Sequence, residues 1–187
     1  WPTVRANGST SWPQGDKALH RPVYTARSLD SAAGHLDADI YLHDGGRVTE
    51  WARRLQPNDQ VAIIGPGGGG VPAVNRIHMF ADETGYPAVA RILEALDPST
   101  TGSASLLSNS STTKDYEFNG PPSVNVRWYG CDQQEKFHVR AREIANTATD
   151  AFFWYAGEKA EAIKMRELAN EVGIEKTNRY IAAYWTQ

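Results

Sequence analysis

The stretch from His20 to Ala52, HRPVYTARSLDSAAGHLDADIYLHDGGRVTEWA, decides how the chain is organised. It contains a strand-like run with interleaved aromatic, hydroxyl and guanidinium groups, then an alternating strand that ends in a histidine, and finally a glycine turn that leads into a short helix. A flat, partly apolar ring with a diphosphate tail needs these parts, because strand edges and an aromatic side chain hold a ring and a helix N-terminus holds phosphates. The stretch therefore predicts a site for such a ligand.

Turn residues and periodicity divide the first part of the chain into short elements. The first 20 residues have a loop-like composition. We predict strands at 23–29 and 36–42 joined by a turn at Gly34, a helix at 47–55 and a third strand at 61–64. The glycine-rich run at 65–70 lacks the lysine and hydroxyl of a nucleotide triphosphate loop, so a hinge is favoured over a phosphate loop. We therefore set a domain boundary after residue 72.

The second part alternates between strand and helix patterns. Strands are predicted at 77–81, 105–107, 124–128, 151–155 and 180–185. Helices are predicted at 84–96, at 137–148 and after Gly157, the last one ending at Gly173. This alternation predicts a parallel sheet that is covered by helices on both faces.

Composition limits the possible functions. The chain has 187 residues, 41% of them hydrophobic, and a net charge of −3, which gives no reason to expect nucleic acid as a partner. No apolar run reaches the roughly 18 residues of a membrane span, and no signal-peptide pattern opens the chain. Cys131 is alone, so no internal disulfide can form, which fits a reducing cytoplasm. The histidines lack metal-ligand spacing and no nucleophile elbow is present, so we predict neither a protein-bound metal nor a catalytic side chain.

The motifs of the first part resemble those of the siderophore-interacting proteins, a family of FAD-containing ferric-siderophore reductases. In that family an R-x-Y-T-x-R strand, a D-F-V-L-H-like strand and a G-P-A-S-x-W-A-like turn and helix follow one another. The counterparts here are Tyr24-Thr25-Ala26-Arg27, Asp39-Ile40-Tyr41-Leu42-His43 and Gly46-Arg47-Val48-Thr49-Glu50-Trp51-Ala52. Two positions depart from the pattern. Pro22 stands where the first arginine belongs, with Arg21 one place further away, and Gly46-Arg47 replaces the glycine-proline pair.

The second part carries motifs of the same resemblance at the ends of its strands. The segment 81–88, ADETGYPA, resembles the family's G-D-E-T-A-x-P-A, and Ala156-Gly157-Glu158 resembles its W-V-A-G-E. Ligands of open α/β sheets bind at such strand ends, although Thr84 as a simple helix cap is an equal alternative. Tyr184-Trp185 resembles a G-Y-W-R segment that returns toward the flavin, with an aromatic core strand as the alternative. The dinucleotide fingerprint of dehydrogenases is absent, which favours a pocket of the ferredoxin-reductase-like kind.

The resemblance implies a partial, flavin-binding β-barrel of the ferredoxin-reductase-like type over residues 1–72 and an α/β parallel-sheet NAD(P)H-binding domain over residues 73–187. Because about three strands precede this place in the family, we expect a fragment without the first barrel strands. The implied FAD contacts are Arg21, Tyr24, Thr25, Arg27, Leu42, His43, Gly46, Thr49 and Trp185. The implied NAD(P)H contacts are Asp82, Glu83, Thr84, Ala156, Gly157 and Glu158.

The implied function is the reduction of ferric siderophores in the cytoplasm by a monomer that uses FAD, with NADPH or NADH as the electron donor. Hydride passes to the flavin, single electrons pass to the iron, and ferrous iron leaves its hard-oxygen chelator. Two alternatives stay open: a flavin reductase with another acceptor, and a degenerate module that binds nucleotide or siderophore without turnover. The second is favoured by the absent strands, Pro22 and the altered turn. Lys159, Lys164 and Arg166 form either a solvated helix face or a contact to a 2′-phosphate or an anionic chelate.

Overall fold

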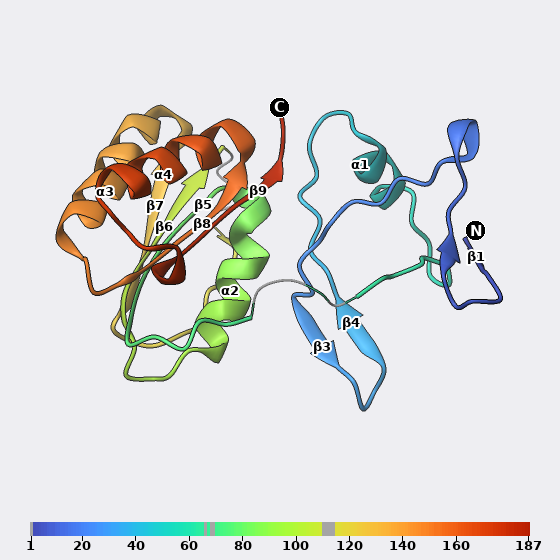
Figure 1. Ribbon diagram of the computed structural model, residues 1–187, viewed down its shortest axis with the longest axis horizontal. Helices are drawn as coiled ribbons and strands as arrows, with labels where there is room; N and C mark the ends of the chain where they lie inside the picture. The colour runs from blue at the N-terminus through green and yellow to red at the C-terminus, as the bar shows by residue number, and fades with distance from the viewer. Residues whose placement is uncertain (1, 66, 68–69, 110–114) are drawn as a thin grey trace.

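The second part of the chain is a five-stranded parallel sheet (Figure 1). The computed structural model describes residues 2–65, 67, 70–109 and 115–187. The strands are β5 (Arg76–Ala81), β6 (Thr101–Ser108), β7 (Val124–Gly130), β8 (Phe152–Glu158) and β9 (Arg179–Trp185). Their spatial order is β7-β6-β5-β8-β9, and every neighbouring pair is parallel. The predicted parallel sheet is therefore confirmed.

Helices cover both faces of this sheet, as predicted. Helix α2 (Tyr86–Ala95) lies on one face, and α3 (Gln134–Thr147) and α4 (Lys159–Glu171) lie on the other (Figure 1). Alternate residues of β5 point to opposite faces, so Met79 packs in the core with α2 whereas Phe80 packs in the core with α3 and α4. Short 3-10 helices precede or follow these elements at η2 (Glu83–Gly85), η4 (Cys131–Gln133) and η5 (Lys176–Asn178). The sheet is thus buried on both sides, which explains its near-continuous apolar strands.

The first part of the chain has short elements. Strands β1 (Thr3–Val4) and β2 (Thr10–Ser11) pair antiparallel, as do β3 (Ser28–Asp30) and β4 (His35–Asp37), and a 3-10 helix, η1, spans Gly15–Lys17. Gly34 has a φ of 70°, which confirms the predicted hairpin turn. Helix α1 covers Arg47–Ala52. The predicted strand at 61–64 is wrong, and the strands at 23–29 and 36–42 are shorter than predicted, because a strand persists only where a neighbour pairs with its backbone.

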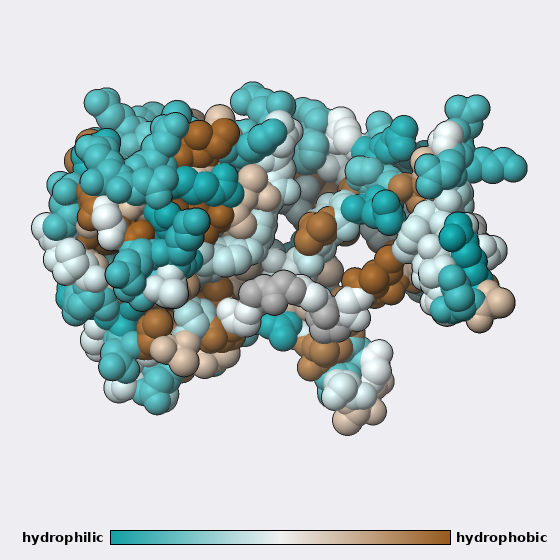
Figure 2. Space-filling view, viewed as in Figure 1, coloured by the Kyte–Doolittle hydropathy of each residue, from teal (hydrophilic) through white to brown (hydrophobic). Residues whose placement is uncertain are grey.

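Apolar side chains remain at the surface of this first part. Thr49 is the one buried residue among the described residues of 2–72, whereas Val23 is 94% exposed and Ile64 is 72% exposed. Figure 2 shows apolar surface on this part of the molecule and in the space between the two parts. The partial barrel therefore has no core of its own comparable with that of the sheet. Of the glycine-rich run, residues 66, 68 and 69 lie outside the described residues.

Within the described ranges, no helix is both long and apolar enough to cross a membrane.

His78 is a buried histidine on the face of β5 that packs against α3. It is 6% exposed, its Nδ1 lies 2.8 Å from Ser103 Oγ, and its Nε2 has no hydrogen-bond partner among the described residues. Burial, together with the smaller effects of the charges of Arg76 and Arg140 and against the opposing charge of Asp150, lowers the pKa of His78 from 6.5 to about 4. The folded protein therefore resists protonation of this ring.

We predict that acidification from about pH 7 to about pH 5 destabilises the protein through His78. The unfolded chain takes up a proton at its ordinary pKa of 6.5, whereas the folded chain does so only near 4. The contribution of neutral His78 to the free energy of unfolding is present above pH 6.5. About 2 kcal/mol of this contribution is lost at pH 5. Urea denaturation measures the loss, which His78→Gln reduces and His35→Gln, at an exposed position, leaves intact. Equal pH dependence of wild type and His78→Gln contradicts the prediction.

Candidate functional site at the junction of the two parts

The carboxyl ends of β5, β8 and β9 meet around the carboxylate of Asp82. Its Oδ1 accepts hydrogen bonds from the backbone N–H and the hydroxyl of Thr84, at 2.9 and 2.6 Å. Its Oδ2 accepts from the backbone N–H of Glu158 and from the indole N–H of Trp185, both at 2.8 Å. The predicted motif residues of three strand ends therefore lie together, and the cap of η2 is Asp82 and not Thr84.

Glycine is required at position 157 because two side chains occupy the space above it. A Cβ placed on Gly157 would lie 2.6 Å from Asp82 Oδ2 and 2.7 Å from the hydroxyl oxygen of Tyr155. Tyr155 is itself buried, and burial, followed by the charge of Asp82, raises its pKa. The backbone of β8 thus approaches Asp82 more closely than any other residue type would allow.

Carboxylates occupy the starts of both helices at this edge of the sheet. The side chain of Glu158 caps α4 by accepting from the N–H groups of Ala160 and Glu161. Glu83 is 6% exposed, accepts from the backbone and side-chain amide of Asn109, and has a pKa raised by burial. Because the first N–H groups of α4 are already bonded to Glu158 and nearby carboxylates repel anions, this edge favours the nicotinamide end of a nucleotide over its phosphates.

Residues 25–27 of the first part run along α2. The side chain of Thr25 contacts Tyr184, and the carbonyl oxygen of Ala26 accepts a hydrogen bond from Arg91. Arg27 then donates two hydrogen bonds to Glu94, at 2.7 and 2.5 Å. This ion pair lowers the pKa of Glu94. The contacts proceed from the carboxyl edge of the sheet toward the opposite end of α2.

Residues 39–41 return in the opposite direction beside the same face. Asp39 accepts a hydrogen bond from the hydroxyl of Tyr116. Tyr41 lies near the carboxyl edge, where burial and the charges of Glu83 and Asp82 raise its pKa. We call the contacts of residues 25–27 and 39–41 with the second part the seam. The seam brings the predicted flavin stretch next to the predicted nicotinamide edge.

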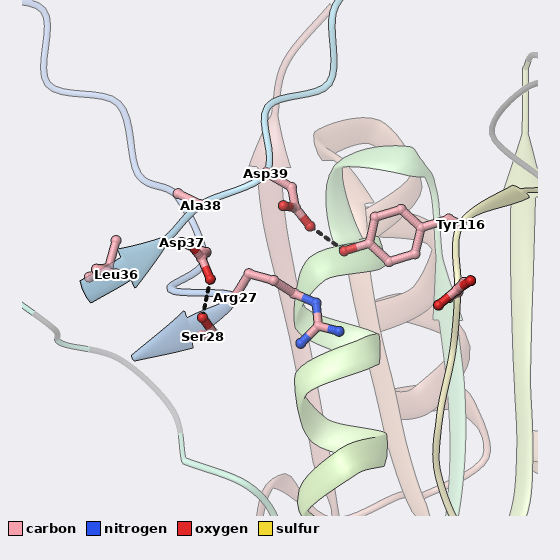
Figure 3. Close-up of a pocket in the computed structure, with 8 residues that line it drawn as sticks. Arg27, Ser28, Leu36, Asp37, Ala38, Asp39 and Tyr116 are labelled. Atoms are coloured by element: carbon pink, nitrogen blue, oxygen red, sulfur yellow. Dashed lines mark hydrogen bonds between the residues drawn. The ribbon is translucent and has the colours of Figure 1, made fainter. Parts of the chain in front are cut away.

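A groove of about 720 Å³ opens beside the seam, between the β3–β4 hairpin and residues 116–117 (Figure 3). Its lining residues come from both parts of the chain and are Arg27, Ser28, Leu36, Asp37, Ala38, Asp39, Tyr116 and Glu117. Three of them are carboxylates, and the one cation is already paired with Glu94. An acidic lining disfavours anionic ligands, so neither a diphosphate nor an anionic chelate is expected in this groove.

Three of the predicted flavin contacts are exposed aromatic or apolar side chains, and their contact with a flavin ring stays a prediction. Tyr24 is 42%, Leu42 is 49% and Trp185 is 40% exposed. Tyr24 and Leu42 each lie next in sequence to a seam residue, and Trp185 follows the seam partner Tyr184. A planar ring inserted between them would remove apolar surface from water, at about 25 cal/mol per Å². These residues therefore fit an isoalloxazine.

Both arginines among the predicted FAD contacts have protein partners in the structure. The guanidinium of Arg21 lies 4.6 Å from the centre of the Trp12 ring. Arg27 is engaged by Glu94 of α2. Contact of either arginine with a flavin stays a prediction.

The predicted diphosphate residues surround the start of α1. His43 Nδ1 lies 3.0 Å from the carbonyl oxygen of Asp44, and the ring of His43 packs against Gly46. Gly46 precedes the six residues of α1 and has a φ of 86°. Thr49 is 2% exposed, so its hydroxyl lies below the surface. The contact of His43 with the flavin ring and its chain, and the diphosphate contacts of Gly46 and Thr49, also stay predictions.

Two of the three basic residues near α4 are engaged within the protein. Lys164 pairs with Glu161 at 2.7 Å, and Arg166 donates to the carbonyl oxygen of Ile181 at 2.9 Å. Lys159, the first residue of α4, is exposed. This arrangement agrees with a solvated helix face for Lys164 and Arg166.

Several residues that join the two parts carry no recognisable sequence signal. Glu94, Tyr116 and Arg91 meet partners that are at least 65 positions away in the chain, and each stands in an ordinary helical or irregular context. Charge at Glu94 and Arg91 on the exposed side of an apolar helix is what any solvated helix shows. No pattern in the sequence separates such residues from surface residues.

A parallel sheet with ligand motifs at its carboxyl edge, beside a partial barrel that carries the flavin motifs, defines a flavoprotein of the ferredoxin-reductase-like fold. The family model described as siderophore-interacting protein matches residues 74–187, and the one described as siderophore-interacting FAD-binding domain matches residues 1–70. The chain belongs to the siderophore-interacting protein family. The predicted family, fold class and FAD-binding character are confirmed.

Several relatives resemble the chain over nearly its whole length. The NADPH-dependent ferric-chelate reductase of Escherichia coli is 28% identical over 98% of this chain and 72% of its own length. The ferric vibriobactin reductase ViuB of Vibrio cholerae is 28% identical over 97% of this chain and 69% of its own. Both names support an oxidoreductase.

Solved structures show the same fold. A siderophore utilization protein from T. fusca superposes on all of this chain and 73% of its own with a TM-score of 0.85 and 25% identity. Ferredoxin-NADP+ reductase from Plasmodium falciparum, at 15% identity, covers 92% of this chain and 80% of its own with a TM-score of 0.57. The latter likeness is one of fold alone.

We predict that Gly157→Ala destabilises the protein by about 1–3 kcal/mol, because the added methyl group overlaps Asp82 and Tyr155. Thermal denaturation followed by circular dichroism measures the loss. Gly70→Ala is the matched control, since a Cβ at Gly70 meets no atom within 4 Å. Equal melting temperatures for both variants contradict the close approach at Gly157.

We predict that Arg27 and Glu94 are coupled across the seam by about 1 kcal/mol or less at low ionic strength, because the pair is partly exposed and solvent screens it. A double-mutant cycle with Arg27→Gln and Glu94→Gln measures the coupling, which high salt weakens. The exposed pair of Glu50, on α1, and Arg54, just beyond its end, at 3.6 Å, is the control. A seam coupling no larger than that of the α1 pair argues against a joining role.

Proposed function

We propose that this chain supplies the flavin- and nucleotide-binding parts of a reductase that takes electrons from NADPH and delivers them through FAD to a ferric siderophore, releasing ferrous iron. The observation that carries the proposal is the seam: Thr25 contacts Tyr184, and Tyr41 lies within reach of the charges of Asp82 and Glu83 at the sheet edge. The two relatives named as ferric-chelate and ferric vibriobactin reductases support the same substrate class.

The residues of the junction would bind and orient. Tyr24, Leu42 and Trp185 would cover the flavin ring, and Thr25 with Tyr184 would hold the strand beside it. When bound, FAD supplies the conversion of a two-electron donor into single-electron delivery. The sheet edge, with its helix starts occupied by carboxylates, would receive the nicotinamide.

No side chain of the edge is required as an acid or a base. All the donors around Asp82 are used in hydrogen bonds within the protein, and Tyr155 is buried with a raised pKa. Reduction alone releases the metal, because the lower charge of ferrous iron weakens its attraction to oxygen ligands. We further expect a monomer and release in the cytoplasm, which the single Cys131 supports.

We predict that the purified protein takes up FAD and turns yellow, and that NADPH bleaches the flavin absorbance in the absence of oxygen. A ferrous-specific dye then reports iron release from several ferric chelates and identifies the acceptor. Tyr24→Ala weakens FAD binding by about tenfold or more, because the ring loses an aromatic contact. Val23→Ala, at a neighbouring position that is 94% exposed, leaves FAD binding unchanged.

The second candidate function is a module that binds its ligand without turnover. The exposure of the side chains in the first part of the chain favours this candidate. Among the described residues of 2–72 only Thr49 is buried, so an isolated chain offers a weak frame for a flavin. A colourless protein that takes up no added FAD, yet binds NADP+ or a ferric chelate in a thermal-shift assay, overturns the reductase in favour of this module. A flavin that forms but accepts electrons from NADPH without reducing any ferric chelate points to another acceptor.

A further inference from the structure

The carboxylate of Asp82 is enclosed by donors from three strand ends. Asp82 is 7% exposed, and its two oxygens accept four hydrogen bonds, two from Thr84, one from the N–H of Glu158 and one from the indole of Trp185. A carboxylate offers about four lone-pair sites, so these donors use its full capacity. Asp82 therefore has no acceptor left for a nucleotide.

The carboxylate is also fixed in orientation. The backbone of Gly157 passes so close that a Cβ there would lie 2.6 Å from Oδ2 and 2.9 Å from the carboxyl carbon of Asp82. Rotation of the carboxyl group would break hydrogen bonds on both oxygens at once. Any effect of Asp82 on a bound ligand therefore passes through the groups that donate hydrogen bonds to it, namely Thr84, the N–H of Glu158 and the indole of Trp185.

Trp185 is the one of these groups that reaches the surface of the junction. Pairing of β8 with β9 proceeds from Gly157 opposite Ala183 to Glu158 opposite Trp185, so Tyr184 is left over as a bulge. A bulge redirects the side chains that follow it. The indole of Trp185 is thereby turned so that its N–H edge is bound to Asp82 while 40% of the residue stays exposed.

We propose that Asp82 is a positioning residue that fixes the orientation of the ring of Trp185, the neighbour of the seam partner Tyr184. Because Oδ2 accepts from both Trp185 and the N–H of Glu158, the start of α4 and the ring move together. A nucleotide that displaces the turn at Gly157 and Glu158 therefore displaces the ring as well. The effect of the Trp185 orientation on a bound flavin rests on the proposed function. The hydrogen bond between Trp185 and Asp82, and its coupling to the start of α4, do not.

Hydrogen exchange of the indole protons tests the bond in the wild-type protein. Trp185 and Trp51 are equally exposed, at 40%, but the indole of Trp51 has no hydrogen-bond partner among the described residues. We expect the indole N–H of Trp185 to exchange about tenfold or more slowly than that of Trp51, since its acceptor is a charged group. Trp185→Phe and Trp51→Phe identify the two resonances in a nitrogen-15 correlation spectrum. Equal exchange overturns the proposal.

Asp82→Asn then tests the positioning. One oxygen becomes an amide that donates, so it can no longer accept from both Glu158 and Trp185, and the Trp185 resonance is expected to shift and lose its protection. NADP+ is the probe for coupling: in wild type it shifts the signals of Glu158 and Trp185 together, and in Asp82→Asn it shifts Glu158 alone. If Asp82→Asn weakens NADP+ binding further in a Trp185→Phe background, Asp82 is a direct ligand and the proposal is overturned.

The same samples separate this inference from the proposed function. If the protein takes up FAD, Asp82→Asn and Trp185→Phe are expected to slow flavin reduction by NADPH by the same factor, and the double variant by no more. If it takes up no FAD, the reductase fails, while the exchange rate and the NADP+ shifts still decide the role of Asp82. An indole that is protected in wild type and equally protected in Asp82→Ala, which removes both oxygens, also overturns the proposal.

Discussion

One buried carboxylate holds the functional edge of the sheet together. Asp82 binds groups that lie 76 and 103 positions further along the chain, and it does so without a cation beside it among the described residues. Burial of an isolated charge is costly, and here four N–H and O–H dipoles replace the lost water. The positions of Gly157, of the α4 start and of Trp185 all depend on this arrangement. A substitution at any one of these groups is therefore expected to shift the positions of the others.

The second part of the fold was predictable because local pattern and burial agree there. Strand β5 is apolar on both faces and is covered on both faces, and α2 and α3 bury the stripes that their spacing predicts. The common location of Asp82 and Gly157 also follows from parallel strand ends. The hydrogen bond from Trp185 to Asp82 does not, because it depends on a one-residue bulge that leaves no mark in the sequence.

The first part was less predictable because its apolar runs need a neighbouring strand to pair with, and some of them have none among the described strands. The run at 61–64 has the composition of a strand, yet Ile63 and Ile64 are exposed and unpaired with any described strand. The hairpin turn at Gly34 was recoverable, since a positive φ selects glycine. Arg27 shows the opposite case: an arginine in a flavin motif gives no indication whether it meets a phosphate or, as here, the carboxylate of Glu94.

Helix α2 has one side in the core and the other side against the flavin stretch. Arg91 and Glu94 are one turn apart, so they project from the same side of the helix. Arg91 donates to the carbonyl oxygen of Ala26, and Glu94 accepts from Arg27, the next residue. Two neighbouring residues of a single helix thus supply part of the seam, beside the contacts of Thr25 with Tyr184 and of Asp39 with Tyr116. Exchange of one long side chain for a shorter one at either of these two helix positions can widen or narrow the gap between the halves while the sheet and its edge stay as they are.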